Sequence, residues 1–136
     1  MTDVILDTNV ASILSPFKHF ASLRPVYEQA AFGRLNVLSV QTVAELYLWA
    51  KLRNWGARRQ AELQLYIDGF TLAPCDVDLA PTWASVVAHS RAVGKPLSTA
   101  DAWVAATALY FGLELLTHDR DFVDLKIPGL KVTCFA

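Results

Sequence analysis

Two aspartates stand where apolar segments of the sequence end, which is a common way to place a carboxylate in a crevice at the edge of a sheet. Asp7 comes directly after the aliphatic residues 4–6, and Asp119 comes just after the apolar segment 113–117. If both segments are parallel strands of one sheet, their carboxyl ends lie at the same edge. The sequence therefore predicts that Asp7 and Asp119 share one crevice.

Two further acids lie on predicted helices. Asp101 falls in the first turn of a helix predicted over residues 100–111, where backbone N–H groups and the helix dipole favour a negative charge. Glu45 lies on a helix predicted over residues 41–52, on a side that is otherwise apolar and includes Trp49. Because a carboxylate among apolar neighbours usually has a partner, Glu45 is expected to bind a metal or a base.

Four carboxylates at one crevice indicate a bound cation. Like charges at short range cannot all stay ionised unless a positive charge lies between them, and no Lys or Arg of the sequence is obviously placed to supply it. A hard divalent ion meets this need, and all-oxygen ligands favour Mg²⁺ or Mn²⁺. Each acid alone also has a structural interpretation: Asp7 as a turn cap, Asp101 as a helix cap and Asp119 as a loop opener. The set of four favours the metal site.

The elements that must position these acids alternate between strand and helix. Strands are expected at residues 4–6, 36–39, 70–73, 113–117 and 130–134. Helices are expected at residues 22–32, 41–52, 57–67, 78–93 and 100–111, the last of them capped by Ser98 or Thr99. Short apolar strands that alternate with helices favour an α/β fold, with a parallel or mostly parallel sheet covered on both faces.

Length and composition set the limits of this interpretation. The sequence has 136 residues, which is the usual size of one domain that buries its core without disulfides, so residues 1–136 are expected to form a single domain. Hydrophobic residues make up 54% and charged residues 18%, which excludes a disordered chain and leaves apolar surface for a partner. Cys75 and Cys134 have no CxxC partner, which argues against a zinc site and favours buried reduced thiols.

Charge and hydropathy exclude two classes of protein. A net charge of −1 does not fit a protein that coats nucleic acid through charge alone. No apolar run reaches the roughly 18 residues of a membrane span. The first residues lack a basic region and include Asp3 and Asp7, unlike a signal peptide. A cytoplasmic protein with no membrane partner is therefore expected.

Four short motifs carry a resemblance to a known family. They are DTNV at residues 7–10, TVAEL at 42–46, STADAWVAATAL at 98–109 and THDRDF at 117–122. In this order and spacing they resemble the four acidic motifs of the PIN-domain ribonucleases, and specifically of the VapC toxins of toxin–antitoxin pairs. The resemblance implies a three-layer α/β/α fold with a central, mainly parallel, five-stranded sheet. It also implies a Mg²⁺-dependent endoribonuclease that a cognate antitoxin keeps silent.

The resemblance carries over individual residues. Asp7, Glu45, Asp101 and Asp119 become the catalytic and metal-binding cluster, with Asn9 and the Thr99 hydroxyl as supporting groups. Asp121 is an alternative to Asp119, which is preferred because it lies nearer the strand end. In this interpretation Mg²⁺, or Mn²⁺ in its place, activates water and bridges the scissile phosphate of RNA, while the carboxylates hold the metal.

Several neighbouring residues remain open between a functional and a structural role. Basic residues near the motifs could hold RNA phosphates or simply face solvent: Arg53, Arg58, Arg59, Arg91, Lys95 and Arg120. His118 could contact a phosphate, act as a general acid, or be structural. The helix over 41–52 is apolar on nearly all sides, so it either lies in the core or covers an interface through Tyr47, Trp49 and nearby Trp55.

The choice of partners and two alternative functions complete the sequence-based picture. The resemblance implies a homodimer and an antitoxin that docks near the active site. One alternative is a receiver-like domain phosphorylated on Asp7, which the absence of a DxDx[TV] pattern disfavours. The other is a catalytically silent PIN-like module that binds RNA or protein, which the presence of all four acids disfavours.

Overall fold

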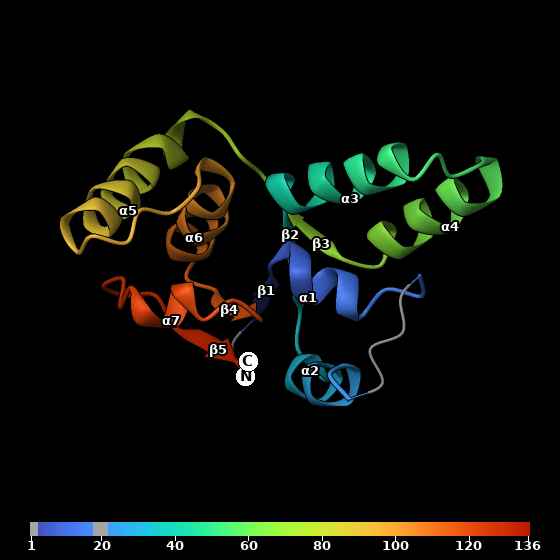
Figure 1. Ribbon diagram of the computed structural model, residues 1–136, viewed down its shortest axis with the longest axis horizontal. Coiled ribbons are helices and arrows are strands. Elements are labelled where there is room, and N and C mark those ends of the chain that lie inside the picture. Colours follow the sequence, from blue (N-terminus) through green and yellow to red (C-terminus); the bar gives the residue numbers. More distant parts are fainter. Residues whose placement is uncertain (1–2, 18–21) are drawn as a thin grey trace.

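The computed structural model describes residues 3–17 and 22–136, and a five-stranded sheet lies at its centre (Figure 1). The strand order is β3-β2-β1-β4-β5, and all four pairings are parallel. The strands are β1 (Val4–Leu6), β2 (Asn36–Ser39), β3 (Thr71–Ala73), β4 (Glu114–Thr117) and β5 (Val132–Cys134). The prediction of an α/β fold on a mainly parallel five-stranded sheet is confirmed.

Helices connect the strands and cover both faces of the sheet. They are α1 (Thr8–Ile13), α2 (Arg24–Ala31), α3 (Val40–Leu52), α4 (Ala57–Asp68), the 3₁₀ turn η1 (Val77–Leu79), α5 (Ala80–Ala92), α6 (Thr99–Phe111) and α7 (Asp121–Asp124). Figure 1 shows α1, α3 and α4 on one side of the sheet and α5 and α6 on the other. The molecule therefore has the predicted three layers.

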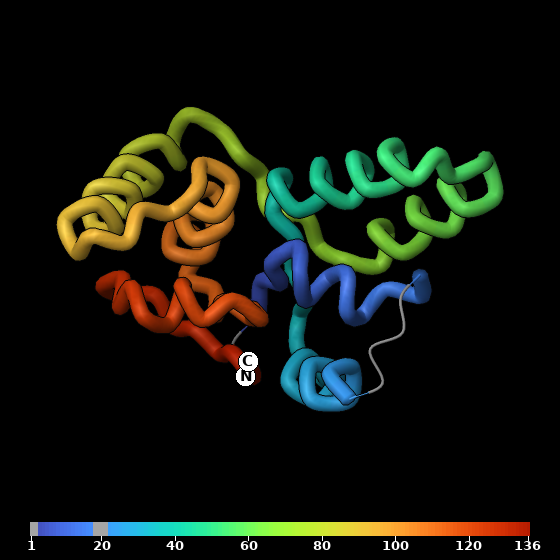
Figure 2. Tube along the Cα trace, viewed as in Figure 1, coloured from blue at the N-terminus to red at the C-terminus, as the bar shows by residue number. Residues whose placement is uncertain are grey.

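Side chains of alternate strand residues build the two halves of the core. Val4 and Leu6 of β1 pack with the helices α1 to α4, while Ile5 packs with α5, α6 and α7. Because successive side chains point to opposite faces of the sheet and both faces are covered, all three residues of β1 are buried. Figure 2 shows the same strand in the middle of the chain trace, between the early strand β2 and the late strand β4.

The helix that carries Asp101 is closely packed because it is rich in alanine. Ala102, Ala105 and Ala108 of α6 are completely buried, so the backbone approaches the sheet without large side chains in between. Ser98 caps the helix, as one of the two predicted candidates, and Gly112 ends it in the left-handed conformation with φ of 66°. The sequence signals for this helix were strong at both ends, and its bounds match the prediction within one residue.

Two short helices were not predicted. α1 has six residues and α7 has four, which is too short for an apolar periodicity to show in the sequence. Helix 78–93 was predicted as one element, but the chain forms the 3₁₀ turn η1 first and then α5, whose first turn contains Pro81. Residues 22–23 and 130–131 lie outside the regular elements in which they were predicted.

The structure separates the two roles, core and interface, that the sequence left open for α3 and Trp55. Trp55 is only 8% exposed and packs in the core with Phe17 and Trp49, so it does not belong to an interface. The exposed large hydrophobic residues of α3 are Val40, Tyr47, Leu48 and Leu52, the last of them 73% exposed. The prediction of buried thiols is also wrong for Cys75, which is exposed. Among the described residues, no helix is both long and apolar enough to cross a bilayer.

Candidate active site

Asp7 is placed by the junction of β1 and α1. Its extended backbone ends the strand, and its Oδ1 accepts a hydrogen bond of 2.9 Å from the N–H of Val10, which makes it the N-cap of α1. The side chain is 6% exposed, and its second oxygen accepts a hydrogen bond from the Thr117 hydroxyl. Asp7 is thus a buried acid, held in one orientation at the carboxyl edge of the sheet.

Thr117 is a site residue that the sequence analysis missed. Its hydroxyl donates to Asp7 and accepts the N–H of Asp119 at 3.0 Å, so one side chain joins two of the predicted acids. The parallel register of β1 and β4 pairs Leu6 with Leu116, which sets the two following residues side by side. A polar residue at the end of a buried apolar strand was the available signal, but its meaning depends on that register.

Asp101 reaches the same edge from α6. Its N–H donates to the Ser98 hydroxyl over 3.1 Å, which fixes the first turn of the helix and leaves the Asp101 carboxylate partly exposed. Thr99, predicted as a supporting group, is exposed and is the first residue of α6 rather than its cap. The side-chain cap at this helix start is therefore Ser98.

Glu45 faces the site from α3. The Gln41 amide donates a hydrogen bond of 2.9 Å to Glu45 Oε1, and the carboxylate is partly buried. As predicted from the sequence, it lies among apolar neighbours: it lines a groove of about 230 Å³ that is formed by Thr8, Ser12, Glu45, Leu46, Leu48, Trp49, Leu52 and Arg53. A carboxylate and a guanidinium thus border the same groove.

The electrostatic surroundings of Asp7 disfavour its charged form. The pKa of Asp7 is raised from 3.8 to about 6, chiefly by burial, although the hydrogen bonds from Thr117 and Val10 oppose the rise. The charges of Asp101 and Asp119 contribute to the same rise. The carboxylates are therefore close enough to repel one another.

Asp101 experiences the same repulsion. Its pKa is raised chiefly by burial, against the hydrogen bond with Ser98, and further by the charges of Asp119, Glu45 and Asp121. The charged groups with the largest effects on the pKa of Asp7 and Asp101 are all acids. The four predicted acids thus share one region of negative charge.

The structure distinguishes Asp119 from Asp121. Asp119 is half-buried, its backbone is held by Thr117, and its charge acts on both Asp7 and Asp101. Asp121 is exposed at the start of α7, and its N–H donates to Asp119 Oδ1 over 2.9 Å. This geometry favours Asp119 as the fourth acid, with Asp121 orienting it.

Asn9 and Thr99 are not brought into contact with the acids. Both are exposed, and neither forms a hydrogen bond with the four carboxylates within residues 3–17 and 22–136. Polar groups of another kind lie beside Asp7 instead. The Thr8 and Ser39 hydroxyls both contact the Thr42 hydroxyl at 3.3 Å. No local sequence pattern indicates that these hydroxyl groups meet, because they come from three different elements.

The basic residues of the predicted phosphate contacts differ in their positions. Arg53 borders the groove of Glu45 and lies over the Trp49 ring at 5.1 Å, where a cation–π contact holds it. Arg58 pairs with Glu62 on the exposed side of α4. Arg53 is therefore a predicted basic residue that lines the same groove as Glu45.

His118 contacts the Tyr27 hydroxyl through its ring nitrogen Nδ1. This contact favours the structural role among those that the sequence left open for His118.

The acids fit a divalent cation by their chemistry. All four offer carboxylate oxygens, and a cation would relieve the repulsion that raises the pKa of Asp7 and Asp101. No three His, Cys, Asp or Glu side chains of the described chain already stand close enough together to hold a metal. The site thus has the donor set and charge for a cation, without a closed coordination shell.

The sheet order, the acids at its carboxyl edge and the sequence itself agree with one class of protein. The PIN domain family model matches residues 4–128, so the chain belongs to the PIN domain family. Its place within that family is with the VapC ribonucleases. The chain is 30% identical over 136 residues to the VapC ribonuclease Y4jK of Sinorhizobium fredii, covering 95% of this chain and 94% of that protein.

A further relative agrees with this placement, and a solved structure agrees with the fold. The chain is 37% identical over 90 residues to ribonuclease VapC5 of Mycobacterium tuberculosis, covering 64% of this chain and 66% of that protein. The structure of VapBC2 from Rickettsia felis, bound to a DNA fragment, matches with a TM-score of 0.81 at 17% identity, over 98% of both chains. The predicted family, the fold and a ribonuclease toxin as the function class are confirmed.

Proposed function

We propose that this ribonuclease toxin is an endonuclease that depends on Mg²⁺, or on Mn²⁺ in its place, and that residues 1–136 act as one PIN domain. The observation that carries this proposal is the uncompensated charge at the carboxyl edge of the sheet, where acids raise one another's pKa. A buried carboxylate without a counter-charge lowers the stability of the folded protein, and a bound cation offsets this loss of stability.

The four acids have different roles in this proposal. Asp7 and Asp101 bind the cation directly, because burial, together with the charges of neighbouring acids, raises the pKa of both carboxyl groups. Glu45 and Asp119 bind it directly, through water, or only when RNA is present. Asn9 and Thr99 act through water or substrate, since both are exposed. When bound, the cation supplies Lewis-acid activation of water and offsets charge on the scissile phosphate.

The chain's own side chains prepare the site for RNA. Thr117 keeps Asp7 in one rotamer, which holds its second oxygen at a fixed position for binding. Arg53 borders the groove that contains Glu45 and can bind a backbone phosphate beside the site of cleavage. The apolar groove wall, including Trp49, excludes water from one side of Glu45 and offers a surface for a base.

The partners in this proposal are RNA, a cognate antitoxin and a second copy of the chain. Related toxins have been solved as VapBC complexes, among them VapBC-5 from Mycobacterium tuberculosis. The exposed apolar residues Val40, Leu48 and Leu52 of α3 supply surface for a protein partner. In the cell we place the protein in the cytoplasm, where RNA and a co-expressed antitoxin are available.

Cleavage of a mixed RNA pool by antitoxin-free protein tests the proposal. With Mg²⁺ the protein should cleave internal bonds, EDTA should stop it, and Asp7→Asn should lower the rate by about 100-fold or more, since the variant keeps the shape but loses a ligand charge. Asp68→Asn is the matched control, because Asp68 is an exposed acid at the end of α4 and should leave the rate unchanged.

The alternative is a PIN domain that binds RNA or protein without cleaving it. It is favoured by the absence of a closed metal shell in the described residues. Cleavage that persists in EDTA would exclude the metal-dependent mechanism. RNA binding without any cleavage, at saturating Mg²⁺ or Mn²⁺, would favour the silent module.

A further inference from the structure

Tyr27 connects α2 to the part of β4 that carries the acidic site. The side chain is completely buried, and its hydroxyl lies 2.9 Å from the Thr117 carbonyl, 2.7 Å from His118 Nδ1 and 3.1 Å from the Phe135 nitrogen. These three partners come from two segments that lie far apart from α2 in the sequence. One buried oxygen therefore holds three points of the chain.

The chemistry of a phenol fixes the direction of each hydrogen bond. A tyrosine hydroxyl has one proton to donate and accepts from its lone pairs. The Phe135 N–H can only donate and the Thr117 carbonyl can only accept, so Tyr27 gives its proton to Thr117 and accepts from Phe135. His118 must then donate from Nδ1, which makes Nδ1 the protonated nitrogen of the ring.

This hydroxyl takes the place of the next rung of the sheet. Strands β4 and β5 pair up to Thr117 and Cys134, where the ladder ends. The Thr117 carbonyl and the Phe135 N–H come directly at that end, and Tyr27 satisfies both of them. Without the hydroxyl, two backbone groups at the end of β4 and β5 would lose their partner, in a place that is buried at Thr117 and partly buried at Phe135.

The same residue of β4 also contacts two acids through its side chain. The Thr117 hydroxyl donates to Asp7 and accepts the Asp119 N–H, while the Thr117 carbonyl binds Tyr27. The position of the Thr117 side chain thus depends on a backbone that Tyr27 holds. We propose that Tyr27 is a positioning residue, which keeps Thr117 and Asp119 in place beside Asp7; the proposal rests on the metal-dependent function above.

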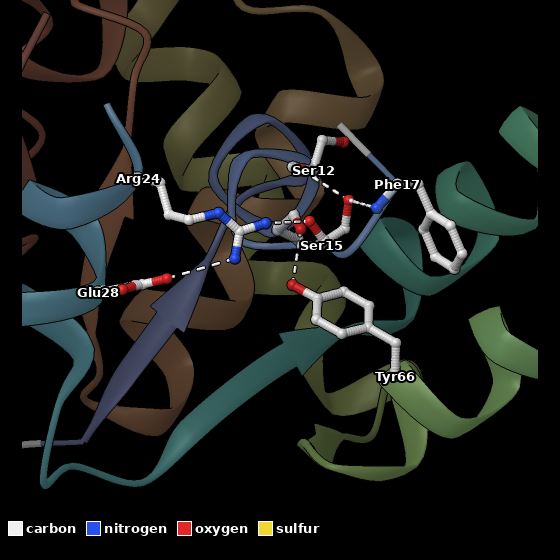
Figure 3. A network of polar contacts seen from close by, with 7 residues as sticks. Ser12, Ser15, Phe17, Arg24, Glu28 and Tyr66 are labelled. Carbon is white, nitrogen blue, oxygen red and sulfur yellow. Dashed lines mark hydrogen bonds and ion pairs between the residues drawn. The ribbon is translucent and has the colours of Figure 1, made fainter. Parts of the chain in front are cut away.

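A second tyrosine supplies a matched control. Figure 3 shows the Tyr66 hydroxyl directed at α1, where it donates to the Ala11 carbonyl over 2.7 Å. In the same network Arg24 donates to the Ser15 carbonyl and pairs with Glu28. Tyr66 therefore makes the same kind of bond as Tyr27, from phenol to backbone carbonyl, but its partner Ala11 has no side-chain hydrogen bond to the acids, unlike Thr117.

The experiment compares wild-type protein, Tyr27→Phe and Tyr66→Phe. Calorimetry with Mn²⁺ measures metal affinity, hydrogen exchange of the Asp119 and Phe135 amides in the metal-free protein measures local order, and RNA cleavage is followed against Mg²⁺ concentration. Tyr27→Phe should weaken Mn²⁺ binding about 10-fold or more, as loss of a supporting contact does at metal sites. Its two amides should exchange faster, and high Mg²⁺ should restore much of the cleavage.

The control separates positioning from general stability. Tyr66→Phe should lower the melting temperature by a similar amount while keeping the Mn²⁺ affinity of the wild-type protein. Equal affinities for Tyr27→Phe and Tyr66→Phe would overturn the positioning role, and would leave the proposed function intact if the wild-type protein binds Mn²⁺. No Mn²⁺ binding by the wild-type protein would overturn the proposed function and the role of Tyr27 together.

His118→Phe covers the case in which Tyr27→Phe is too unstable to assay. This substitution removes one partner of the hydroxyl and keeps an aromatic ring against Tyr27, whose ring lies 5.6 Å from that of His118. Because the Tyr27 hydroxyl keeps its bonds to Thr117 and Phe135 but loses the third group that holds it, Mn²⁺ affinity should fall below that of the wild-type protein, by less than the about 10-fold expected for loss of the whole hydroxyl. An affinity equal to that of the wild-type protein would count against the positioning role.

Discussion

Asp7 and Glu114 have the same exposed fraction, 6% each, yet the pKa values of their carboxyl groups are shifted in opposite directions. Asp7 lies just beyond the end of β1, and Glu114 lies at the start of the adjacent strand β4. The pKa of Asp7 is raised to about 6, whereas that of Glu114 is lowered. The pKa of a buried acid is thus raised at one end of this pair of strands and lowered at the other.

The partners of Glu114 explain why its pKa falls although burial alone would raise it. Burial raises the pKa of Glu114 too, but the Thr133 hydroxyl and the Arg34 guanidinium outweigh it, and Lys131 lies 3.7 Å away. Asp7 also accepts two hydrogen bonds, but its charged neighbours are other acids. A paired buried acid contributes to stability, while an unpaired one keeps a site ready for a cation.

The largest effect on stability is expected at the paired acid. Glu114→Gln leaves Arg34 without its carboxylate in a place where the Arg34 side chain is only 13% exposed. We expect a loss of about 2–4 kcal/mol in the free energy of unfolding near neutral pH, because the buried Arg34 charge then faces a neutral amide in place of the carboxylate. Because the pKa of Glu114 is lowered in the folded protein, the difference from wild type should shrink as the solution becomes acidic.

Urea unfolding at several pH values, in the presence of EDTA, measures this difference. A Glu114→Gln variant as stable as the wild-type protein at neutral pH would show that the ion pair contributes nothing, and the comparison with Asp7 would lose its basis.

The opposite sign is expected at Asp7. The folded pKa of about 6 lies above the unfolded value, so this group stabilises the protein below the unfolded pKa and loses that contribution as pH rises to about 6. Asp7→Asn should therefore make the metal-free protein about 1–3 kcal/mol more stable near neutral pH, where the wild-type carboxylate is charged. The asparagine keeps an oxygen for the Val10 N–H.

The same unfolding experiment measures the gain, which should vanish near about pH 4, where Asp7 of the wild-type protein is protonated. A variant that is less stable than wild type at every pH would mean that the loss of a hydrogen bond outweighs the relief of repulsion.

A bound divalent cation should give Asp7 the counter-charge that Glu114 already has in Arg34. Millimolar Mg²⁺ or Mn²⁺ should raise the melting temperature of the wild-type protein by mass action, with about 1.4 kcal/mol of stabilisation at ten times the dissociation constant. The shift should decrease below the pKa of Asp7, about 6, because protons compete with the cation. Differential scanning fluorimetry checks both effects.

Two variants make this measurement specific. Asp7→Asn combined with Asp101→Asn should abolish the metal-induced shift, while Glu114→Gln should keep it despite its lower starting stability. An unchanged wild-type melting temperature at millimolar metal would weigh heavily against the site.

The smallest effect on stability is expected on the exposed side of α3. Leu52→Glu changes a side chain that is 73% exposed, so the free energy of unfolding should stay within about 0.5 kcal/mol of the wild-type value. Its oligomeric mass by light scattering, or its binding to a purified antitoxin, should fall. Trp55→Glu should instead unfold the protein, because Trp55 lies in the core. A Leu52→Glu variant with unchanged mass and antitoxin binding would exclude this face as an interface.

The sequence by itself was sufficient for much of the fold. Apolar runs too short for helices, each followed by a segment with helical spacing, require a parallel sheet covered on both sides. The end of β1 therefore placed Asp7 at the carboxyl edge without knowledge of any contact. The cap at Ser98 and the glycine at 112 marked the helix of Asp101 for the same local reason.

The same local signals were too weak for short elements. Helices α1 and α7 have too few turns to show a period, and their existence depends on contacts with the sheet and its loops. The sequence also could not separate Trp55 from Leu52, because an apolar residue fits a core and an interface equally well. Which one is covered depends on the path of the chain after α3.

Only the tertiary structure decided which partners each acid has. Arg34 and Glu114 are eighty positions apart in the sequence, and Thr117 and Asp7 are one hundred and ten apart, so no local pattern links them. The register of β1 with β4 sets Thr117 beside Asp7, and the loop before β2 brings Arg34 to Glu114. A charge interacts with whatever lies near it in space. The sequence therefore determined where carboxylates could gather, and the packing of the strands determined which of them remained without a counter-charge.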